Sequence, residues 1–468
     1  MCGIAGAYGV ENAAYNVSLM LRAMQHRGQE AAGIVSSDGD QLYEHKSFGL
    51  VDEVFGGFEK TDSKDDFALR LPGTSAIGHI RYATTGDKKD EQNIQPFVAR
   101  RTRSMKALVH NGNLTNYHEM RERLEKDGAI FRSSSDTELF LHLMTHSKAS
   151  TAAGRLIDAC ERAEGAYALL ALTPDSLVAA VDPLGFRPLS FARMGNGWLF
   201  ASETCAFDLF GLQSSTSMRP DQMIELTGDS HLDFLDGTGR GFARQCSFEH
   251  IYFTKPDSTI FGVSAGSVRK KLGIALAAEA PTATDIVIAV PDSSNTMAMA
   301  YAQALGIPFG FGLVKNHYAG RTFTTPKQTA RQLGVRMKFN ADRDVVAGKT
   351  VTVVDDSIVR GTTSLKIVEL LRSAGAKEVH LRIASPPVVH PCYWGIDTPH
   401  REELIAYSLT AEQLLKKIGA DSLYYLSIAA LRRALDDEDE QRYCTTCFTS
   451  ILPENQLISV SSLFAKRE

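Results

Sequence analysis

The sequence predicts two consecutive domains of different fold class, an α+β domain over residues 2–240 and an α/β domain with a parallel sheet over residues 241–468. Its 468 residues exceed the length at which one hydrophobic core keeps growing, which favours two or three domains. The first half alternates short apolar segments with glycine-rich turns. After about residue 245, each apolar segment is instead followed by a helical pattern.

The elements expected in the first half are short strands interrupted by three helices. Apolar runs predict strands over residues 76–82, 106–114, 166–172, 176–182, 197–203 and 223–226. Apolar residues at helical spacing predict helices over residues 15–25, 116–127 and 136–146. Sheets covered by helices are typical of an α+β domain.

The second half predicts strands that each lead directly into a helix. The strand expected over residues 285–290 precedes a helix that ends near Gly306. The strand expected over residues 350–354 precedes a helix whose C′ position suits Gly375. Such alternation indicates a parallel sheet with helices on both faces, and ligands of these sheets bind at the carboxyl ends of the strands.

The composition is that of an ordinary globular protein and argues against several classes of function. Fifty basic and 55 acidic side chains give a net charge of −5, so there is no electrostatic footprint for a nucleic acid. No stretch approaches the roughly 20 apolar residues of a membrane span, and the N-terminus lacks the basic segment of a signal peptide. We expect a cytoplasmic protein with no nucleic-acid or membrane partner.

Cys2 directly follows the initiator methionine. Removal of Met1 would leave a first residue that carries both a thiol and a free α-amine. The thiol needs a base to become a reactive thiolate, and an α-amine with an ordinary pKa of roughly 7.7 to 8.0 can serve as that base. Taken alone, the position also fits an inert cysteine near a flexible start.

Three further segments of the first half could complete an amide-cleaving site. Asn111 and Gly112 lie in an HNGN segment at the end of a predicted strand. A turn there could direct the side chain of Asn111 and the backbone N–H of Gly112 towards an oxyanion. Arg81 could bind an α-carboxylate, and Asp136 could pair with an α-ammonium group. The plainer alternatives are a hairpin turn for HNGN, a surface charge for Arg81 and a helix N-cap for Asp136.

Together with Cys2, these segments resemble the glutamine amidotransferase domain of the N-terminal-nucleophile hydrolases. The matching motifs are MCGIAG, QHRGQEAAGI (25–34), GHIRYATTG (78–86), HNGNLTN (110–116) and SSDTEL (134–139). The resemblance implies an αββα sandwich in which Cys2 is the nucleophile and its α-amine carries the proton. It also implies an oxyanion hole made by Asn111 and Gly112, and glutamine-binding residues Arg27, Arg81 and Asp136. Because a retained Met1 would block the amine, activity should require its removal.

The segment VVDDSIVRGTTS (353–364) in the second half suits a phosphorylated sugar. Backbone N–H groups and hydroxyls at Gly361 to Ser364 could bind a phosphate at the N-terminus of a helix. Asp355 and Asp356 could bind ribose hydroxyls and a metal ion, although an N-capping aspartate in a polar turn would explain about half of the run. A second loop, AVPDSSNT (289–296), offers amides and hydroxyls for a pyrophosphate.

Residues 315–343, between these loops, are rich in lysine and arginine and could close over a polyanion as a mobile flap. The three segments resemble the type I phosphoribosyltransferases. The resemblance implies Mg²⁺ contacts from Ser293, Asp355 and Asp356, and flap cations that include Lys315 and Arg321. It implies a phosphate loop made of Ser357, Ile358, Val359, Arg360, Gly361, Thr362 and Thr363.

The two halves together resemble the amidophosphoribosyltransferase family, with CSFEHIYFTKPDS (246–258), GRTF (320–323) and SPPVVHPCYWGID (385–397) as further matches. The resemblance implies that glutamine and phosphoribosyl pyrophosphate react to give phosphoribosylamine, glutamate and pyrophosphate, at the start of purine synthesis. It implies a homotetramer inhibited by purine nucleotides, with Tyr252 at the position that couples the two sites. His317 replaces the arginine that is usual in the flap.

Seven cysteines, an odd number in a long chain, do not indicate a secreted disulfide framework. Cys160 and Cys205 are expected to be small buried residues. For Cys246, Cys392, Cys444 and Cys447, the residue types alone are compatible with a zinc site, a redox CxxC or four unlinked thiols. The resemblance to one branch of the amidophosphoribosyltransferases implies a [4Fe–4S] cluster held by Cys246, Cys392, Cys444 and Cys447. Each subunit would then contain one such cluster and one Mg²⁺.

Two other functions compete with this interpretation. Another glutamine-dependent synthase would need a sugar-isomerase type of second half or an SGGxDS-like nucleotide loop, and neither is present in the sequence. A phosphoribosyltransferase fold could also serve as an effector-binding regulator. That function predicts a DNA-binding segment and no need for Cys2, yet no helix-turn-helix is evident and the first site is complete.

Overall fold

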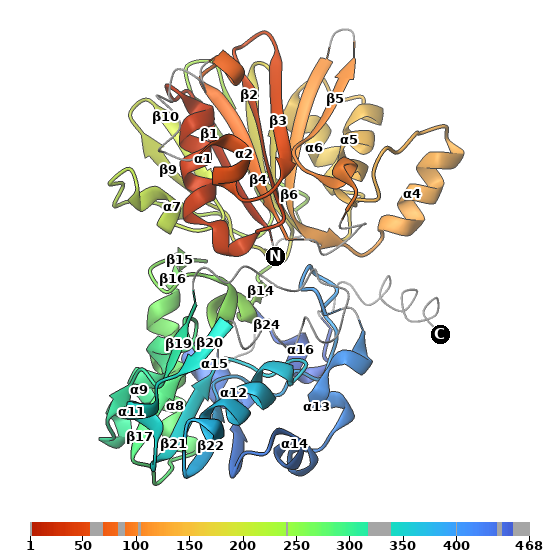
Figure 1. The fold of residues 1–468 in the computed structure, drawn as a ribbon. Coiled ribbons are helices and arrows are strands. Elements are labelled where there is room, and N and C mark those ends of the chain that lie inside the picture. Colours follow the sequence, from red (N-terminus) through yellow and green to blue (C-terminus); the bar gives the residue numbers. More distant parts are fainter. Residues whose placement is uncertain are drawn as a thin grey trace.

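The structure, a computed structural model, describes residues 2–56, 69–82, 89–101, 104–239, 242–316, 338–398, 400–437 and 442–452. Figure 1 shows two domains, one above the other, with the N-terminus at the junction between them. The first domain is a sandwich of two sheets, and the second is built around one sheet. No helix within the described ranges is long and apolar enough to cross a membrane.

Seven strands form the first sheet of the sandwich, in the order β11-β9-β10-β1-β4-β2-β3. Its strands are β1 (Gly3–Tyr8), β2 (Ala31–Ser37), β3 (Leu42–Phe48), β4 (Ser75–Arg81), β9 (Ser190–Met194), β10 (Gly197–Ala201) and β11 (Thr216–Ser217). Every pairing is antiparallel. β1 lies between β10 and β4 near the middle, which places the N-terminus of the chain in a well-ordered part of the sheet.

Six strands form the second sheet, in the order β13-β12-β8-β7-β6-β5. Its strands are β5 (Phe97–Arg101), β6 (Ser104–Leu114), β7 (Gly165–Leu172), β8 (Ser176–Val181), β12 (Gln222–Thr227) and β13 (His231–Asp236). The inner faces of the two sheets meet in one apolar core that includes Ile4, Ile77, Val109 and Leu170. Alternating apolar residues on facing strands explain why the two sheets stack.

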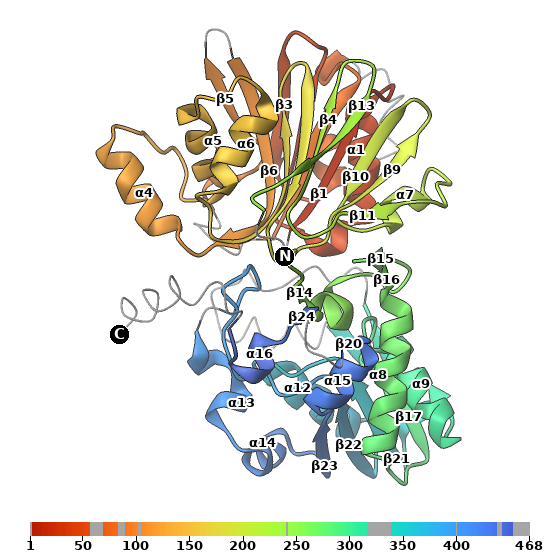
Figure 2. The same ribbon diagram turned by 180° about the vertical axis from the view of Figure 1, so that it is seen from behind.

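Helices cover both outer faces of the sandwich, as Figures 1 and 2 show from opposite sides. The helices are α1 (Ala13–Ala23), α2 (Val51–Phe55) and α7 (Cys205–Asp208) on the first sheet, with α4 (Tyr117–Lys126), α5 (Thr137–His146) and α6 (Ala152–Cys160) beside the second. Each set packs its apolar residues on its own sheet. The αββα arrangement expected for this half is therefore confirmed.

The second domain contains a five-stranded parallel sheet in the order β18-β17-β21-β22-β23. Its strands are β17 (Ile286–Ala289), β18 (Phe309–Gly310), β21 (Thr350–Asp355), β22 (Glu378–Ile383) and β23 (Ser422–Tyr425). One face packs on α8 (Ala265–Glu279), α9 (Asn295–Leu305) and α15 (Ile428–Ala434). The other face packs on α11 (Arg343–Val346), α12 (Thr362–Ser373), α13 (Ile405–Ser408) and α14 (Ala411–Ile418). The predicted α/β domain with a parallel sheet is confirmed.

Smaller elements join the two domains and flank the parallel sheet. They are β14 (Gln245–Cys246) with β24 (Tyr443–Cys444), β15 (Thr259–Ile260) with β16 (Val263–Ser264), β19 (Leu313–Lys315) with β20 (Phe339–Ala341), the π-helix η3 (Glu249–Phe253) and α16 (Thr446–Thr449). The parallel pair β14-β24 brings the end of the described chain back to the domain junction. Local periodicity predicts neither this pair nor the π-helix, because both depend on contacts between distant segments.

Candidate functional site

Cys2 lies immediately before β1, and its side chain is buried at the junction of the domains. Its Sγ donates a hydrogen bond of 3.5 Å to the carbonyl oxygen of Tyr82. Burial raises the pKa of the Cys2 thiol, and the positive charge of Arg81 offsets part of that rise. The thiol is therefore protonated at neutral pH and needs a base before it can attack a carbonyl carbon.

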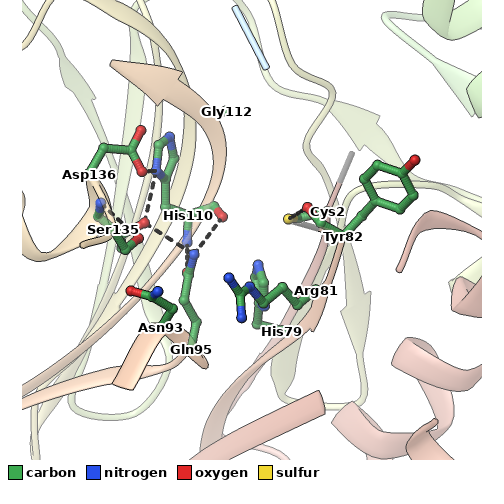
Figure 3. A pocket seen from close by; sticks show the side chains of 11 residues that line it. Cys2, His79, Arg81, Tyr82, Asn93, Gln95, His110, Gly112, Ser135 and Asp136 are labelled. Carbon is green, nitrogen blue, oxygen red and sulfur yellow. Dashed lines mark hydrogen bonds and ion pairs between the residues drawn. The ribbon is translucent and has the colours of Figure 1, made fainter. Parts of the chain in front are cut away.

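A small cavity opens beside the Cys2 thiol (Figure 3). It is lined by Cys2, His79, Arg81, Tyr82, Asn93, Gln95, His110, Gly112, Ser135, Asp136 and Thr137. Its volume of about 20 Å³ holds roughly one water molecule. A substrate as large as an amino acid therefore requires the cavity to widen. Figure 3 shows Arg81 reaching from the Cys2 side towards Gln95.

Two histidines beside the cavity are neutral and do not act as its base. Burial, together with the charge of Arg81, lowers the pKa of His79 to about 3. Burial also lowers the pKa of His110, whose Nδ1 lies 3.1 Å from the Thr137 hydroxyl. A base whose conjugate acid has a pKa near 3 is too weak to take a proton from a thiol. The α-amine that Cys2 would carry after removal of Met1 is a far stronger base.

Asn111 and Gly112 lie within β6 and not in the turn that the HNGN segment predicts. The strand runs on to Leu114, and Gly112 pairs with Tyr167 of β7. A Cβ atom on Gly112 would lie 1.9 Å from the carbonyl oxygen of Ala166, so only glycine fits this close approach. The Nδ2 of Asn111 is buried and has no hydrogen-bond partner among the described residues. An unpartnered buried donor is what an oxyanion hole requires before its substrate binds.

Arg81 and Asp136 both line the cavity, as a pair of substrate-binding residues should. Arg81 is only 4% exposed, which excludes the surface-charge alternative. Asp136 does stand at the N-cap position of α5, but its side chain makes no capping hydrogen bond. Its Oδ2 instead accepts a hydrogen bond of 2.9 Å from the amide of Leu114. This bond ties the carboxylate to the end of the strand that carries Asn111.

Arg27 does not line the cavity but supports Cys2 from behind. Its Nε donates to the Cys2 carbonyl oxygen at 3.0 Å. Its two terminal nitrogens pair with Glu203 at 2.6 Å and Glu249 at 2.9 Å, and all three side chains are fully buried. A glutamine-binding role for Arg27 stays a prediction; the contacts show a positioning role. Sequence reasoning missed both acids, although a glutamate inside an apolar run is a usable signal.

Asp355 and Asp356 lie at the carboxyl end of β21, close to the loop that precedes α9. The Ser293 hydroxyl donates to Oδ2 of Asp356 at 2.5 Å, and the Ser294 hydroxyl lies 3.3 Å from Oδ1 of Asp355. Burial raises the pKa of both carboxyls, and the charge of Asp356 raises that of Asp355 further. Two buried acids that destabilise each other's charged form are a suitable pair of ligands for a hard cation.

The loop from Ser357 to Gly361 ends at the N-terminus of α12. Gly361 adopts a left-handed conformation with φ of 73°, and a Cβ there would lie 2.4 Å from Ile405 Cδ1. Within the described chain, the amides of residues 357–364 donate no hydrogen bonds to protein groups. Free amides at the start of a 12-residue helix are suited to binding a phosphate.

The predicted flap cations are only partly described. Lys315, at the end of β19, forms an ion pair with Asp292 in the loop after β17. The Nε of Arg360 donates a hydrogen bond of 2.7 Å to the carboxylate of Glu403. Arg321 and His317 lie outside the described residues. Because Lys315 is the first residue of the basic segment 315–343 and Asp292 lies in the loop 289–296, this ion pair places the start of the basic segment beside that loop.

The cysteines predicted as cluster ligands gather at the domain junction. Cys246 pairs with Cys444 in the register of β14 and β24. The Cys447 carbonyl accepts hydrogen bonds from residues 389 and 390, close to Cys392. Burial raises the pKa of Cys447, and charges on the other three thiols raise it further. Among the described residues, however, no group of three or more histidines, cysteines or acids is arranged to hold a metal ion.

The other two cysteines lie in the first domain and are 3% and 5% exposed, as expected for Cys160 and Cys205. Burial raises the pKa of Cys205 to about 12, so this thiol is unreactive at neutral pH. Cys2 therefore differs from them in lining a cavity, not in being buried.

Comparisons with known proteins identify both halves of the chain. A family model described as a glutamine amidotransferase domain matches residues 79–208, and one described as a phosphoribosyl transferase domain matches residues 264–384. The chain is 47% identical over 454 residues to the chloroplastic amidophosphoribosyltransferase of Glycine max, covering 97% of this chain and 78% of that protein. It is 45% identical over 458 residues to the amidophosphoribosyltransferase of Bacillus subtilis, covering 97% and 94%.

The whole fold has a solved relative. The structure of glutamine phosphoribosylpyrophosphate amidotransferase from B. subtilis, complexed with ADP and GMP, superposes with a TM-score of 0.88 at 44% identity and covers 97% of each chain. The likeness spans both domains and both loop regions described above. The chain thus belongs to the amidophosphoribosyltransferase family and is a phosphoribosyltransferase that carries a glutamine amidotransferase domain.

Proposed function

We propose that the chain transfers ammonia, released from glutamine at Cys2, to 5-phosphoribosyl 1-pyrophosphate. The products are 5-phosphoribosylamine, glutamate and pyrophosphate, and the reaction opens purine nucleotide synthesis. The observation that carries the proposal is the presence of two complementary sites in one chain. One site has a buried thiol in a cavity that Gly112 also lines, and Asn111, next to Gly112 in the chain, carries an unpartnered amide donor. The other has a buried pair of acids beside a loop of free amides.

The glutamine half of the reaction uses the residues around the small cavity. Arg81 would bind the α-carboxylate and Asp136 the α-ammonium group, which fixes the amide carbon near Cys2. The α-amine takes the thiol proton, and the thiolate attacks the carbonyl carbon. Asn111 Nδ2 and the Gly112 N–H then stabilise the oxyanion, and the α-amine returns the proton to the departing ammonia. Hydrolysis of the thioester releases glutamate.

The phosphoribosyl half separates pyrophosphate from the sugar. The amides of residues 357–364 would bind the 5-phosphate, and the loop carrying Ser293 would bind the pyrophosphate. Mg²⁺ bound near Asp355 and Asp356 would supply charge stabilisation for the pyrophosphate oxygens. Lys315, already beside this loop, adds a positive charge on the same side. Ammonia then attacks the anomeric carbon.

We also propose that Cys246, Cys392, Cys444 and Cys447 hold a [4Fe–4S] cluster. The proposal is supported by their common neighbourhood and by the raised pKa values of Cys246, Cys444 and Cys447, which burial causes first and neighbouring thiols increase, because a bound metal would stabilise the thiolates. Binding would draw the thiols closer than they stand in this structure. The role would be structural, since these residues connect the end of the described chain to both domains.

Regulation, assembly and location extend the proposal beyond the chemistry. The B. subtilis relative was solved with ADP and GMP, which supports feedback inhibition of this chain by purine nucleotides. A homotetramer in the cytoplasm remains our expectation from the family resemblance. The coupling role of Tyr252, which lies in the π-helix and is 42% exposed, is likewise a proposal.

The proposal predicts a strict stoichiometry in anaerobically purified protein. With glutamine, phosphoribosyl pyrophosphate and Mg²⁺, the protein should form glutamate and pyrophosphate in equal amounts, and a chelator of Mg²⁺ should stop both. Iron and sulfide analysis of the same sample should give about four of each per chain. Glutamate formation without pyrophosphate would contradict the transfer, and a sample that holds zinc in place of iron would contradict the cluster.

A further inference from the structure

A segment of the second domain packs directly on the strand that carries the oxyanion donors. The Nδ2 of Asn113 donates a hydrogen bond of 2.7 Å to the carbonyl oxygen of Tyr393, which is 280 residues away in the chain. A Cβ atom on Gly395 would lie 3.1 Å from the carbonyl carbon and oxygen of Gly112. Residues 393–395, named here the YWG segment, therefore contact Gly112 and its neighbour on β6.

The YWG segment is itself held rigidly. Trp394 is 2% exposed and stacks on Phe186, with ring centroids 4.9 Å apart and planes inclined by 21°. The carbonyl oxygen of Trp394 accepts a hydrogen bond of 2.9 Å from Nε of Arg187, whose guanidinium is fully buried and also contacts Glu249. A buried aromatic anchor and a charge-assisted hydrogen bond fix the backbone of this segment against the first domain.

We propose that the YWG segment positions the oxyanion hole of the glutamine site. The inference rests on the proposed function, because it assigns to Asn113 and the YWG segment the task of holding Asn111 and Gly112 in place. Hydrogen-bond donors stabilise a developing oxyanion only when they are held within about 0.5 Å of the productive geometry. Asn113 touches no substrate in this account and is a positioning residue.

The position of Cys392 extends the inference to the four cysteines that are proposed to hold the cluster. Cys392 directly precedes Tyr393, so any bond that anchors this cysteine also anchors the YWG segment. Its amide lies 3.3 Å from the hydroxyl of Thr398, which closes a short loop around the segment. Anchoring of Cys392 by a bound cluster would thereby stiffen a strand of the other domain.

The matched variants Asn113→Ala and Asn116→Ala test the inference. Asn116 lies in the same domain, is also half-buried, and donates a similar hydrogen bond of 2.8 Å to the carbonyl oxygen of Arg162. With Asn113→Ala we expect kcat for glutamine hydrolysis to fall by about 10- to 100-fold, because partial displacement costs less than complete loss of a donor. The KM for glutamine should change little, since Arg81 and Asp136 keep their positions.

The ammonia-dependent reaction of both variants reports whether the second domain remains folded, and it should stay within about twofold of the parent. Asn113→Asp should lower kcat further, because a carboxylate would face the Tyr393 carbonyl oxygen. Equal losses in Asn113→Ala and Asn116→Ala, or no loss in either, would overturn the inference. A parent enzyme that cannot use glutamine would instead refute the proposed function, so the two failures are distinguishable.

Hydrogen exchange supplies a readout that does not depend on turnover. In Asn113→Ala, and in Cys392→Ser, the amides of residues 108–114 should exchange faster than in the parent and in Asn116→Ala. Amides of β1 should be unaffected, because the contacts described for the YWG segment are with β6, Phe186 and Arg187. Unchanged exchange over residues 108–114 in both Asn113→Ala and Cys392→Ser would show that the segment does not hold the strand.

Discussion

Replacement of Asp355 by asparagine is expected to abolish turnover with glutamine and with ammonia alike, and to raise the melting temperature of the metal-free protein. Activity should fall about a thousandfold or more, since the charge that would bind Mg²⁺ beside the pyrophosphate is halved. Both nitrogen sources are affected because both use the same phosphoribosyl site. The two effects have opposite signs, and that combination distinguishes a functional carboxylate from a structural one.

The rise in stability follows from the raised pKa of the buried carboxyl. Burial and the charge of Asp356 raise the folded-state pKa of Asp355 well above its ordinary value. The folded protein then binds a proton more tightly than the unfolded chain, so this group destabilises the fold as pH rises above the unfolded pKa of roughly 3.9. Asparagine removes that cost. Each kcal/mol gained raises the melting temperature by roughly 2–4 °C in a domain of this size.

The matched control for this experiment is Asp285→Asn. Asp285 lies at the opposite end of the same sheet, where its Oδ2 accepts a hydrogen bond of 2.8 Å from the Thr350 amide. This variant should keep both activities and should not be more stable than the parent. Calorimetry and initial rates measured on both variants at pH 7 decide the matter. A stable Asp355→Asn protein with normal ammonia-dependent turnover would remove Asp355 from the site.

Replacement of Arg27 by methionine should lower the free energy of unfolding by about 3–5 kcal/mol. The guanidinium forms ion pairs with both Glu203 and Glu249, and none of the three side chains is exposed. Methionine fills a similar volume but leaves two carboxylates buried without this cation. The same change removes the hydrogen bond to the Cys2 carbonyl, so the glutamine reaction should weaken more than the ammonia reaction.

Urea denaturation measures this effect against a surface pair. In Arg372→Met, the lost partner is Asp421, and both side chains are about one-third exposed. The loss in free energy of unfolding should therefore stay below about 1 kcal/mol.

The destabilisation in Arg27→Met should also depend on pH. Burial alone would raise the pKa of Glu203, but His26 and Arg27 hold it well below its ordinary value. This stabilisation is present above the unfolded pKa of roughly 4.3 and is lost as pH falls. The difference in free energy of unfolding between the parent and Arg27→Met should therefore become smaller in acid. A difference that does not change with pH would contradict the explanation by charge.

The patterns of the sequence predicted the fold class of each half, and the resemblance to known families implied the αββα sandwich. Apolar runs located β4, β6, β7, β8, β10 and β12, and the strand–helix alternation located the parallel sheet. For the HNGN segment, the strand expected over residues 106–114 is confirmed by β6, although the residue types also suit a turn. Extension of β6 through it depends on pairing with β7, and Gly112 is required there by the close approach of Ala166. That approach is a tertiary contact with no local signature.

The candidate site was predictable where a residue type has recognisable chemistry in a short motif. Cys2, Arg81, Asp136, Asp355 and Asp356 were predicted in this way, and the structure places the first three at one cavity and the last two beside Ser293 and Ser294. The supporting residues were not found. Glu203 and Glu249 contact Arg27 across more than 170 residues, and Asn113 contacts Tyr393 across 280. Such partners are brought together only by tertiary packing, within the first domain for Glu203 and between the two domains for Glu249 and Tyr393.

The most direct test of the central claim, that one chain releases ammonia at Cys2 and uses it at a separate phosphoribosyl site, is a comparison of nitrogen sources in Cys2→Ala. Cys160→Ala is the matched control, because it removes a buried thiol of the same domain that does not line the cavity beside Cys2. In Cys2→Ala, glutamine-dependent formation of pyrophosphate should fall at least about a thousandfold, while ammonia-dependent formation should persist at the parent rate. Cys160→Ala should retain both. Loss of both activities in a folded Cys2→Ala protein, or retention of the glutamine-dependent one, would contradict the claim.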